Sequence, residues 1–473
     1  MLGKIKQDLQ QNLFKTRLTE LINMDHPLVK LAHEISWDKI EAEFEGLFSK
    51  EGRPSIAVRK IAGMLLLKEM FKESDESVVE RWIENAYWQY FTGEDFFQTE
   101  QPFDPSNFVH FRKRIGERGL EFLLGQSVSL HPKAKTEDEV QIDTTVQEKN
   151  ITFPTDAKLA KKVIDNCVKI AEKEGVVQRQ SYKRVSKQLL RSAYFGHHPK
   201  RQKNARMARK KLRTIGKRLL RELERKLPES VLKDYREIFA IYLKALTQEK
   251  TTKDKIYSLH ESQVACIAKG KSGKNYEFGT KVAVVRGRKT GIISSVKRFS
   301  GNPHDSKTLE ESLSQSERVR KSVGGTRPKK AATDRGFRGI KEVEGTLILL
   351  PTKKEKTRYG QQVARLRFRA RAAIEPCISH LKRNHSLGLN FLKGVAGDIH
   401  NALLAGIGYN LKMRLNQIKQ QILFWLEVVL KIFLGKYNFQ NEKLALKELD
   451  VEILQDGATA SEGVDNRLIK LAK

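Results

Sequence analysis

The segment from Arg179 to Lys226 is the most heavily charged part of the chain, and its only acidic residues are Glu222 and Glu224. Like charges three or four residues apart on a helix repel one another, so a free helix of this composition is hard to stabilise. The phosphates of a polyanion would relieve the repulsion. The alternative is a solvated helical hairpin that only aids solubility. The cations of this segment include Arg184, Lys187, Arg191, Arg201, Arg206, Arg209, Lys210, Lys211, Arg213, Lys217, Arg218 and Arg221.

The same imbalance extends over the whole chain. Its 473 residues contain 89 Lys plus Arg against 57 Asp plus Glu, a formal net charge of +32. Self-repulsion on this scale indicates a polyanionic partner, for which nucleic acid is the first candidate and a ribosomal or membrane surface the alternative. With 39% hydrophobic residues the composition is globular, and the length predicts two or three domains.

The cysteines and the hydropathy indicate a reducing compartment and no membrane. Cys167, Cys266 and Cys377 are far apart in the sequence, which predicts neither a disulfide framework nor a zinc site. The first residues lack the apolar stretch of a secretion signal. The apolar run 422–434 is too short to span a bilayer and is interpreted as a packed helix. We expect a cytoplasmic, nucleoid-associated protein.

The N-terminal part, residues 1–130 with a core at about 55–120, is predicted to be all-helical. A first helix follows Ser55, and Ser77 with Glu80 forms a capping box that opens a second, whose apolar side chains recur at three- and four-residue spacing. A third helix begins near Ser106 and carries basic side chains, including Arg112 and Arg114. Three short helices with a basic third one are typical of a helix-turn-helix DNA-binding domain, with a plain helical bundle as the alternative.

Residues 138–415 are predicted to form an α/β domain, a mixed sheet covered by helices, and 416–473 a C-terminal helix with a polar tail. Residues 140–146 alternate apolar and polar side chains as a strand does, and a basic helical insert at about 157–250 follows. The remaining elements are a β-hairpin from 276–285 and 291–299, a helix at 305–315, strands at 331–334 and 346–350, and helices at about 361–383 and 398–414.

Three acids occupy positions that suit a shared metal site. Asp143 lies in the first strand, Asp334 at the end of a later one, and Glu375 on the long late helix. At an effective dielectric constant near 20, each close pair of carboxylates costs about 4 kcal/mol, so a cation must lie between them. Ligation by oxygen alone favours Mg²⁺ or Mn²⁺, and two such ions would serve phosphodiester chemistry. Taken singly, Asp334 before Arg335 and Gly336 is also typical of an ordinary turn.

Two cations are expected beside the third acid. Arg371 and Lys382 lie four residues before and seven after Glu375, so all three project from one face if the helix is continuous. Pro376 could kink the helix and shift Lys382. The alternative is a surface ladder of ion pairs.

These segments resemble a known family. Residues 368–375, continuing to Lys382, are similar to the Tyr-x2-Arg-x3-Glu-x6-Lys signature of DDE transposases from bacterial insertion sequences, especially the group numbered five and the related group four, although Phe368 replaces the Tyr. Residues 142–149 resemble the strand of the first Asp and residues 333–339 the block of the second. Further similar blocks are 258–261, 279–282 and 301–305, so the resemblance covers about residues 55–414.

The resemblance implies an RNase H-like catalytic fold with the helical insert after its first strand. It implies Asp143, Asp334 and Glu375 as ligands of two Mg²⁺ or Mn²⁺ ions, with Arg371 and Lys382 as DNA contacts. The implied reaction is endonucleolytic nicking at the ends of a transposable element, followed by joining of the freed 3′-hydroxyl to target DNA. The expected partners are double-stranded DNA, as terminal inverted repeats and target, and a second copy of the chain in a homodimer assembled on it.

Further DNA contacts are expected at Arg335, at Arg112 and Arg114 of the N-terminal region, and at Arg206, Arg209, Lys210, Lys211 and Arg213 of the insert. Two other functions remain open at this point. An RNase H-like nuclease would cleave DNA without joining it, and a non-catalytic descendant of a transposase would only bind it. The first is distinguished by its products, and the second by its indifference to replacement of the three acids.

Overall fold

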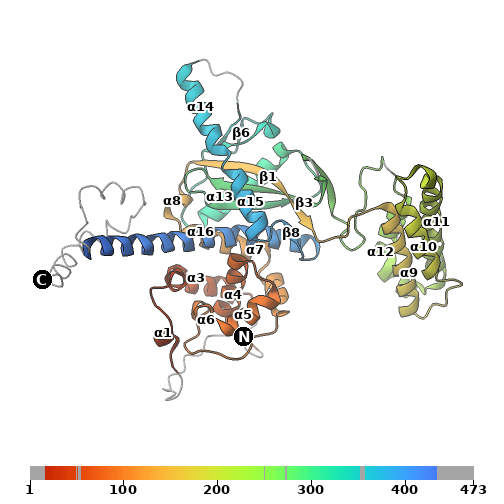
Figure 1. The fold of residues 1–473 in the computed structure, drawn as a ribbon, viewed down its shortest axis with the longest axis horizontal. Helices are drawn as coiled ribbons and strands as arrows, with labels where there is room; N and C mark the ends of the chain where they lie inside the picture. The colour runs from red at the N-terminus through yellow and green to blue at the C-terminus, as the bar shows by residue number, and fades with distance from the viewer. Residues whose placement is uncertain are drawn as a thin grey trace. The chain divides into compact units, whose positions relative to one another are not determined.

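The computed structural model describes residues 16–48, 51, 55–249, 251–271, 274–351 and 357–433 (Figure 1). The chain divides into two compact units, residues 1–415 and 416–473. No helix in the described residues is both long enough and apolar enough to cross a membrane.

The N-terminal region is helical, as expected. A capping box opens α5, but it pairs Ser74 with Ser77 rather than Ser77 with Glu80, so the helix begins three residues earlier than predicted. The second helix predicted after this capping box is divided at Asn85, whose side chain accepts a hydrogen bond from the Trp88 amide and caps α6. The helices are α1 (Leu18–Leu21), α2 (Pro27–Glu34), α3 (Trp37–Glu45), α4 (Val58–Phe71), α5 (Asp75–Glu84), α6 (Ala86–Phe91), α7 (Asn107–Ser129) and α8 (Pro132–Lys135).

The central sheet is mixed, which confirms the predicted fold class at this level. Its strands are β1 (Glu139–Lys149), β2 (Ala265–Lys271), β3 (Lys274–Gly287), β4 (Ile293–Phe299), β5 (Lys330–Ala332), β6 (Glu342–Val343), β7 (Thr346–Leu349) and β8 (Leu389–Asn390). β3 pairs antiparallel with β1 and with β4, which confirms the predicted hairpin. On its other side β1 is parallel to β5, which is parallel to β7. Strand β2 and the two-residue strands β6 and β8 were not expected.

Helices cover both faces of this sheet. The remaining elements of the domain are η2 (Asp305–Thr308), α13 (Leu309–Lys321), η3 (Arg335–Phe337), α14 (Arg358–Arg371), α15 (Ile374–Asn384) and α16 (Gly394–Phe433). Because side chains alternate along a strand, Val284 packs with Leu381 of α15 on one face, while Val285 packs with Leu309 and Leu313 of α13 on the other.

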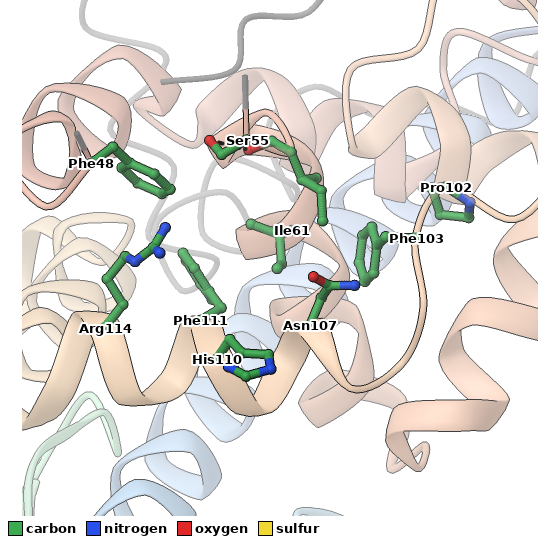
Figure 2. Close-up of a pocket in the computed structure, with 10 residues that line it drawn as sticks. Phe48, Ser55, Ile61, Pro102, Phe103, Asn107, His110, Phe111 and Arg114 are labelled. Carbon is green, nitrogen blue, oxygen red and sulfur yellow. Dashed lines mark hydrogen bonds between the residues drawn. The ribbon is translucent and has the colours of Figure 1, made fainter. Parts of the chain in front are cut away.

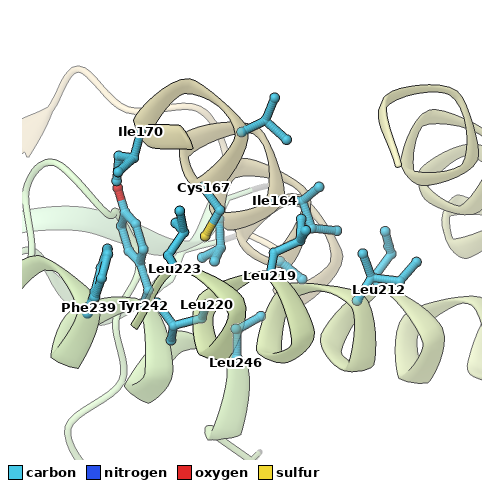
Figure 3. Close-up of a cluster of buried hydrophobic side chains, with 14 of the residues drawn as sticks. Ile164, Cys167, Ile170, Leu212, Leu219, Leu220, Leu223, Phe239, Tyr242 and Leu246 are labelled. Carbon is cyan, nitrogen blue, oxygen red and sulfur yellow. The ribbon is translucent and has the colours of Figure 1, made fainter. Parts of the chain in front are cut away.

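The helical insert follows β1 and has a hydrophobic core of its own. It consists of α9 (Asp156–Lys173), α10 (Lys183–Tyr194), α11 (Gln202–Lys226) and α12 (Glu229–Thr247). Figure 3 shows the buried cluster, in which Ile164 and Cys167 of α9 meet Leu219 and Leu223 of α11 and Tyr242 of α12. The insert is therefore a packed subdomain of four helices rather than a simple hairpin, and its DNA-binding role stays a prediction.

The second unit is described only over residues 416–433, where α16 continues. The predicted C-terminal helix is present. However, Leu423, Trp425, Leu426, Val429 and Leu430 are exposed, so the expectation that this apolar run is packed is wrong for these side chains. The predicted polar tail, residues 440–473, lies outside the described residues.

Candidate active site

Strand register brings the first two acids together. In the parallel pair of β1 and β5, Gln141 lies opposite Ala332. Asp143 and Asp334 each lie two residues beyond these partners, so they are side by side, with Asp143 inside β1 and Asp334 just past the end of β5. The turn after β5 fixes Asp334, whose Oδ1 accepts a hydrogen bond from the Gly336 amide at 2.8 Å.

A single guanidinium lies between these two acids. Nη2 of Arg371 is 3.2 Å from Oδ2 of Asp143 and 3.8 Å from Oδ2 of Asp334. The backbone around Arg371 is held to the sheet, because Nε2 of Gln141 donates to the Ala370 carbonyl at 2.8 Å and Nη1 of Arg286 donates to the Ala373 carbonyl at 2.6 Å. The sequence predicted Arg371 as a neighbour of Glu375, and the structure shows it as the cation of the two aspartates.

Asp143 is the acid most perturbed by this environment. Burial raises its pKa from 3.8 to about 6, and the like charges of Asp334 and Asp305 add to the rise. The Arg371 guanidinium and the Thr144 amide, which donates to Oδ1 of Asp143 at 2.8 Å, act in the opposite direction. The ionised carboxylate therefore lacks sufficient positive charge around it, which is a typical property of a functional acid.

Asp305 is a third acid near Asp143, and the sequence pattern did not single it out. Its Oδ1 accepts hydrogen bonds from Oγ1 of Thr144 at 2.9 Å and from Nζ of Lys281 at 2.8 Å. On the other side it approaches Asp334 across Gly336, where an added Cβ would lie 2.7 Å from Oδ2 of Asp305 and 3.0 Å from Oδ1 of Asp334. The only sequence signal was its place in the family-like block 301–305.

Glu375 lies apart from this cluster. Its side chain is exposed on the first turn of α15, a helix that packs against β1. Among the described residues, no three His, Cys, Asp or Glu side chains lie close enough together to hold a metal ion. The structure thus unites Asp143 and Asp334 but does not bring Glu375 into contact with them.

The late helix is not continuous, which corrects the expectation that Arg371, Glu375 and Lys382 share one face. Residues 372 and 373 form a turn between α14 and α15, in which amides bond three residues back rather than four. Pro376 has no amide proton to donate to the Ala372 carbonyl, and the Glu375 amide occupies that acceptor instead. The proline therefore lies in the first turn of a new helix, where it is well tolerated.

The other predicted contacts of this domain have different surroundings. Nζ of Lys382 is 3.8 Å from Oε1 of Glu277 on β3. Arg335 is exposed beside Asp334.

The N-terminal candidates differ in accessibility. Arg112 is buried and forms a bidentate ion pair with Asp75, at 2.9 and 2.6 Å, so its guanidinium stabilises the fold and is not accessible for the predicted DNA contact. Arg114 is exposed and stacks over the Phe48 ring at 4.7 Å. It lines a hollow against α7 that also includes Phe111 and His110 (Figure 2).

The insert presents its predicted cations in two ways. Arg206, Lys210 and Lys211 of α11 are exposed. Arg209 is exposed as well, but its Nη2 donates to the Ala193 carbonyl at 3.1 Å. Arg213 is less accessible and pairs with Asp156 at 2.9 Å, so its first role is within the subdomain.

Comparisons with known proteins agree with this architecture. Residues 16–114 match the family model described as a transposase domain (DUF772), and residues 246–411 match a transposase DDE domain. Asp334 and Glu375 fall inside the second match, whereas Asp143 lies between the two.

A similar protein is also found in Rhizobium meliloti, the uncharacterized protein ORF8 of the nfe locus. It is 42% identical over 194 residues, which are 40% of this chain and 94% of the relative. No solved structure matches the chain. The two family matches show that the chain belongs to the DDE transposases, and the meeting of Asp143 and Asp334 on the mixed sheet agrees with this.

Proposed function

We propose that this transposase cuts and joins DNA by metal-dependent phosphoryl transfer, with Asp143, Asp334 and Glu375 as the metal ligands. The observation that carries the proposal is the convergence of Asp143 and Asp334 on one guanidinium, where β5 ends beside the interior of the parallel strand β1. Sites in α/β domains typically form at such strand ends.

The two aspartates suit a hard divalent cation. They offer carboxylate oxygens, which Mg²⁺ and Mn²⁺ prefer, and the raised pKa of Asp143 indicates that added positive charge would be favourable there. Bound ions, two in the proposal, would activate a water or a 3′-hydroxyl and stabilise the leaving oxygen of the phosphodiester. The chain itself contributes positioning: Thr144 and Gly336 orient the carboxylates through their amides, and Arg371 balances their charge.

Glu375 is proposed as the third ligand on weaker grounds. It lies on a helix that packs against the strand of Asp143, and the chain reaches Arg371 only four residues earlier. To join the aspartates, its exposed side chain would have to turn toward them when substrate binds. Arg371 and Lys382 are proposed as phosphate contacts near the reacting bond.

The substrate is proposed to be double-stranded DNA, the terminal inverted repeats and a target, bound by two copies of the chain in the cytoplasm. The order β4-β3-β1-β5-β7, with three antiparallel strands followed by two parallel ones, supports the RNase H-like assignment. The exposed cations of α11 and Arg114 are proposed to hold the duplex, with the insert as a clamp.

The test uses duplexes made from the DNA that flanks the gene, pre-nicked or intact, with Mg²⁺. Glu375→Gln is expected to abolish cleavage and joining while leaving duplex binding intact, because it removes charge without removing bulk. The control is Glu342→Gln, at an exposed glutamate of β6. If Glu375→Gln still cleaves DNA, the third metal ligand is another residue. If the unaltered protein cleaves DNA but does not join it, the protein is a nuclease without strand transfer.

A further inference from the structure

Helix α14 presents a row of arginines that neither the fold nor the acidic cluster uses. Arg358, Arg365 and Arg369 are all exposed. They are separated by seven and then four residues, so at 3.6 residues per turn they lie within about 40° of one another on the helix surface. Arg371 lies on a different face, roughly 140° from Arg358 by the same geometry, where it contacts the two aspartates.

The helix is attached to the domain at one end. Gln141 and Arg286 hold the backbone near Ala370 and Ala373, and the packing of α14 against the sheet is with β5. Figure 1 shows α14 leading away from the sheet beyond this attachment. Its outer part is exposed, including Tyr359 at 78%.

Folding alone does not explain this charge pattern. Residues 358–371 contain no acid, and none of the three arginines has a carboxylate partner among the described residues. Arg365 and Arg369 are four residues apart and repel each other. Arg358 occupies the first turn, where the helix dipole disfavours a cation. Such a row is stabilised when an external anion approaches it.

We propose that the outer arginine row of α14 (Arg358, Arg365 and Arg369) binds the phosphate backbone of the DNA duplex next to the reacting bond. The row spans about 17 Å at 1.5 Å per residue. Over that length a duplex presents about ten phosphate charges. Because α14 ends at Arg371, which contacts Asp143 and Asp334, the Arg369 end of the row lies two residues from the site of chemistry, on the opposite face of the helix. This inference rests on the proposed function, since it takes DNA as the substrate.

The experiment measures binding of the full-length protein to a fluorescent mixed-sequence duplex over a range of salt concentrations. Arg358, Arg365 and Arg369 are replaced together by Gln. The matched control replaces Arg318, Lys321 and Lys329, which are exposed but already paired with Glu121, Glu317 and Asp138. Both triple variants lose the same charge, and thermal unfolding checks that both remain folded.

The α14 variant is expected to bind more weakly, with the slope of log affinity against log salt smaller by about 2 to 3, since each phosphate contact contributes about 0.9. The control should keep the slope of the unaltered protein. A photo-crosslinking residue at Gln362, which is exposed and lies within about 60° of the three arginines around the helix, should label the duplex.

Equal slopes for the two triple variants, or no crosslink, would overturn the proposal for α14 while leaving the transposase proposal standing. Failure of the unaltered protein to bind any duplex would instead overturn the proposed function.

Discussion

Replacing Asp143 by Asn should stabilise the metal-free protein, which is unusual for a substitution at a functional position. The side chain is 20% exposed, and its pKa is raised from 3.8 to about 6. A folded-state pKa about 2 units above the unfolded value means that ionisation costs stability, at 1.36 kcal/mol per unit. The penalty is about 3 kcal/mol once the carboxylate is fully ionised, and Asn has nearly the same shape without the charge.

Because the pKa of Asp143 is raised on folding, its cost to stability develops over a defined pH range. Below pH 3.8 both the folded and the unfolded carboxyl are protonated and there is no penalty. As the pH rises from 3.8 to about 6 the unfolded state releases its proton first, so the penalty grows, and above about 6 it is constant. Asp143→Asn should therefore gain little at pH 4 and up to about 3 kcal/mol at pH 8.

The assay is chemical unfolding of both proteins across this pH range in the presence of a chelator. Asp25→Asn serves as the control, since Asp25 forms only an exposed ion pair with Lys30 and should change stability by less than about 1 kcal/mol. With Mg²⁺ added, the unaltered protein and the Asp25→Asn control should gain stability, whereas Asp143→Asn should not. A loss of stability for Asp143→Asn at pH 8 would refute this reasoning.

Three further predictions concern other parts of the chain. Arg112→Ala should destabilise the N-terminal region by about 3 to 5 kcal/mol in chemical unfolding, because it leaves Asp75 without its partner; a loss below 1 kcal/mol would contradict the buried pair. Leu219→Ala should cost about 2 to 5 kcal/mol. In hydrogen exchange, this substitution should lower the protection of the amides of the insert and leave that of the β1 and β3 amides unchanged. An equal loss of protection in both would contradict a separate hydrophobic core in the insert. Asp305→Asn should move the acid limb of the pH–rate profile to lower pH, since it removes a charge that raises the pKa of Asp143, and an unmoved limb would contradict that coupling.

Local patterns in the sequence were sufficient to predict β1, β5, β7, the hairpin and the helical insert. The alternation of apolar and polar residues at 140–146 and the hydrophobic spacing of α11 are periodic signals. They could not reveal strand register, and it is the pairing of Gln141 with Ala332 that brings Asp143 beside Asp334.

The sequence interpretation was wrong where a distant partner decides the role of a residue. Arg112 lies in a basic stretch of the sequence that is typical of a helix surface. In the fold it is buried against Asp75, which is 37 residues away in the sequence. Asp305 was missed because its hydrogen bonds come from Thr144 and Lys281 on two other strands. The break before α15 was foreshadowed only by Pro376.

The most direct test of the metal site is a crystal structure of the protein on duplex DNA with Mn²⁺, using anomalous scattering to locate the ions. We expect a peak at about 2.0 to 2.3 Å from carboxylate oxygens of both Asp143 and Asp334, with Glu375 turned in to complete the ligand set. Arg371 should then contact a DNA phosphate. A structure in which Mn²⁺ binds elsewhere while Arg371 still bridges the two aspartates would contradict the central claim.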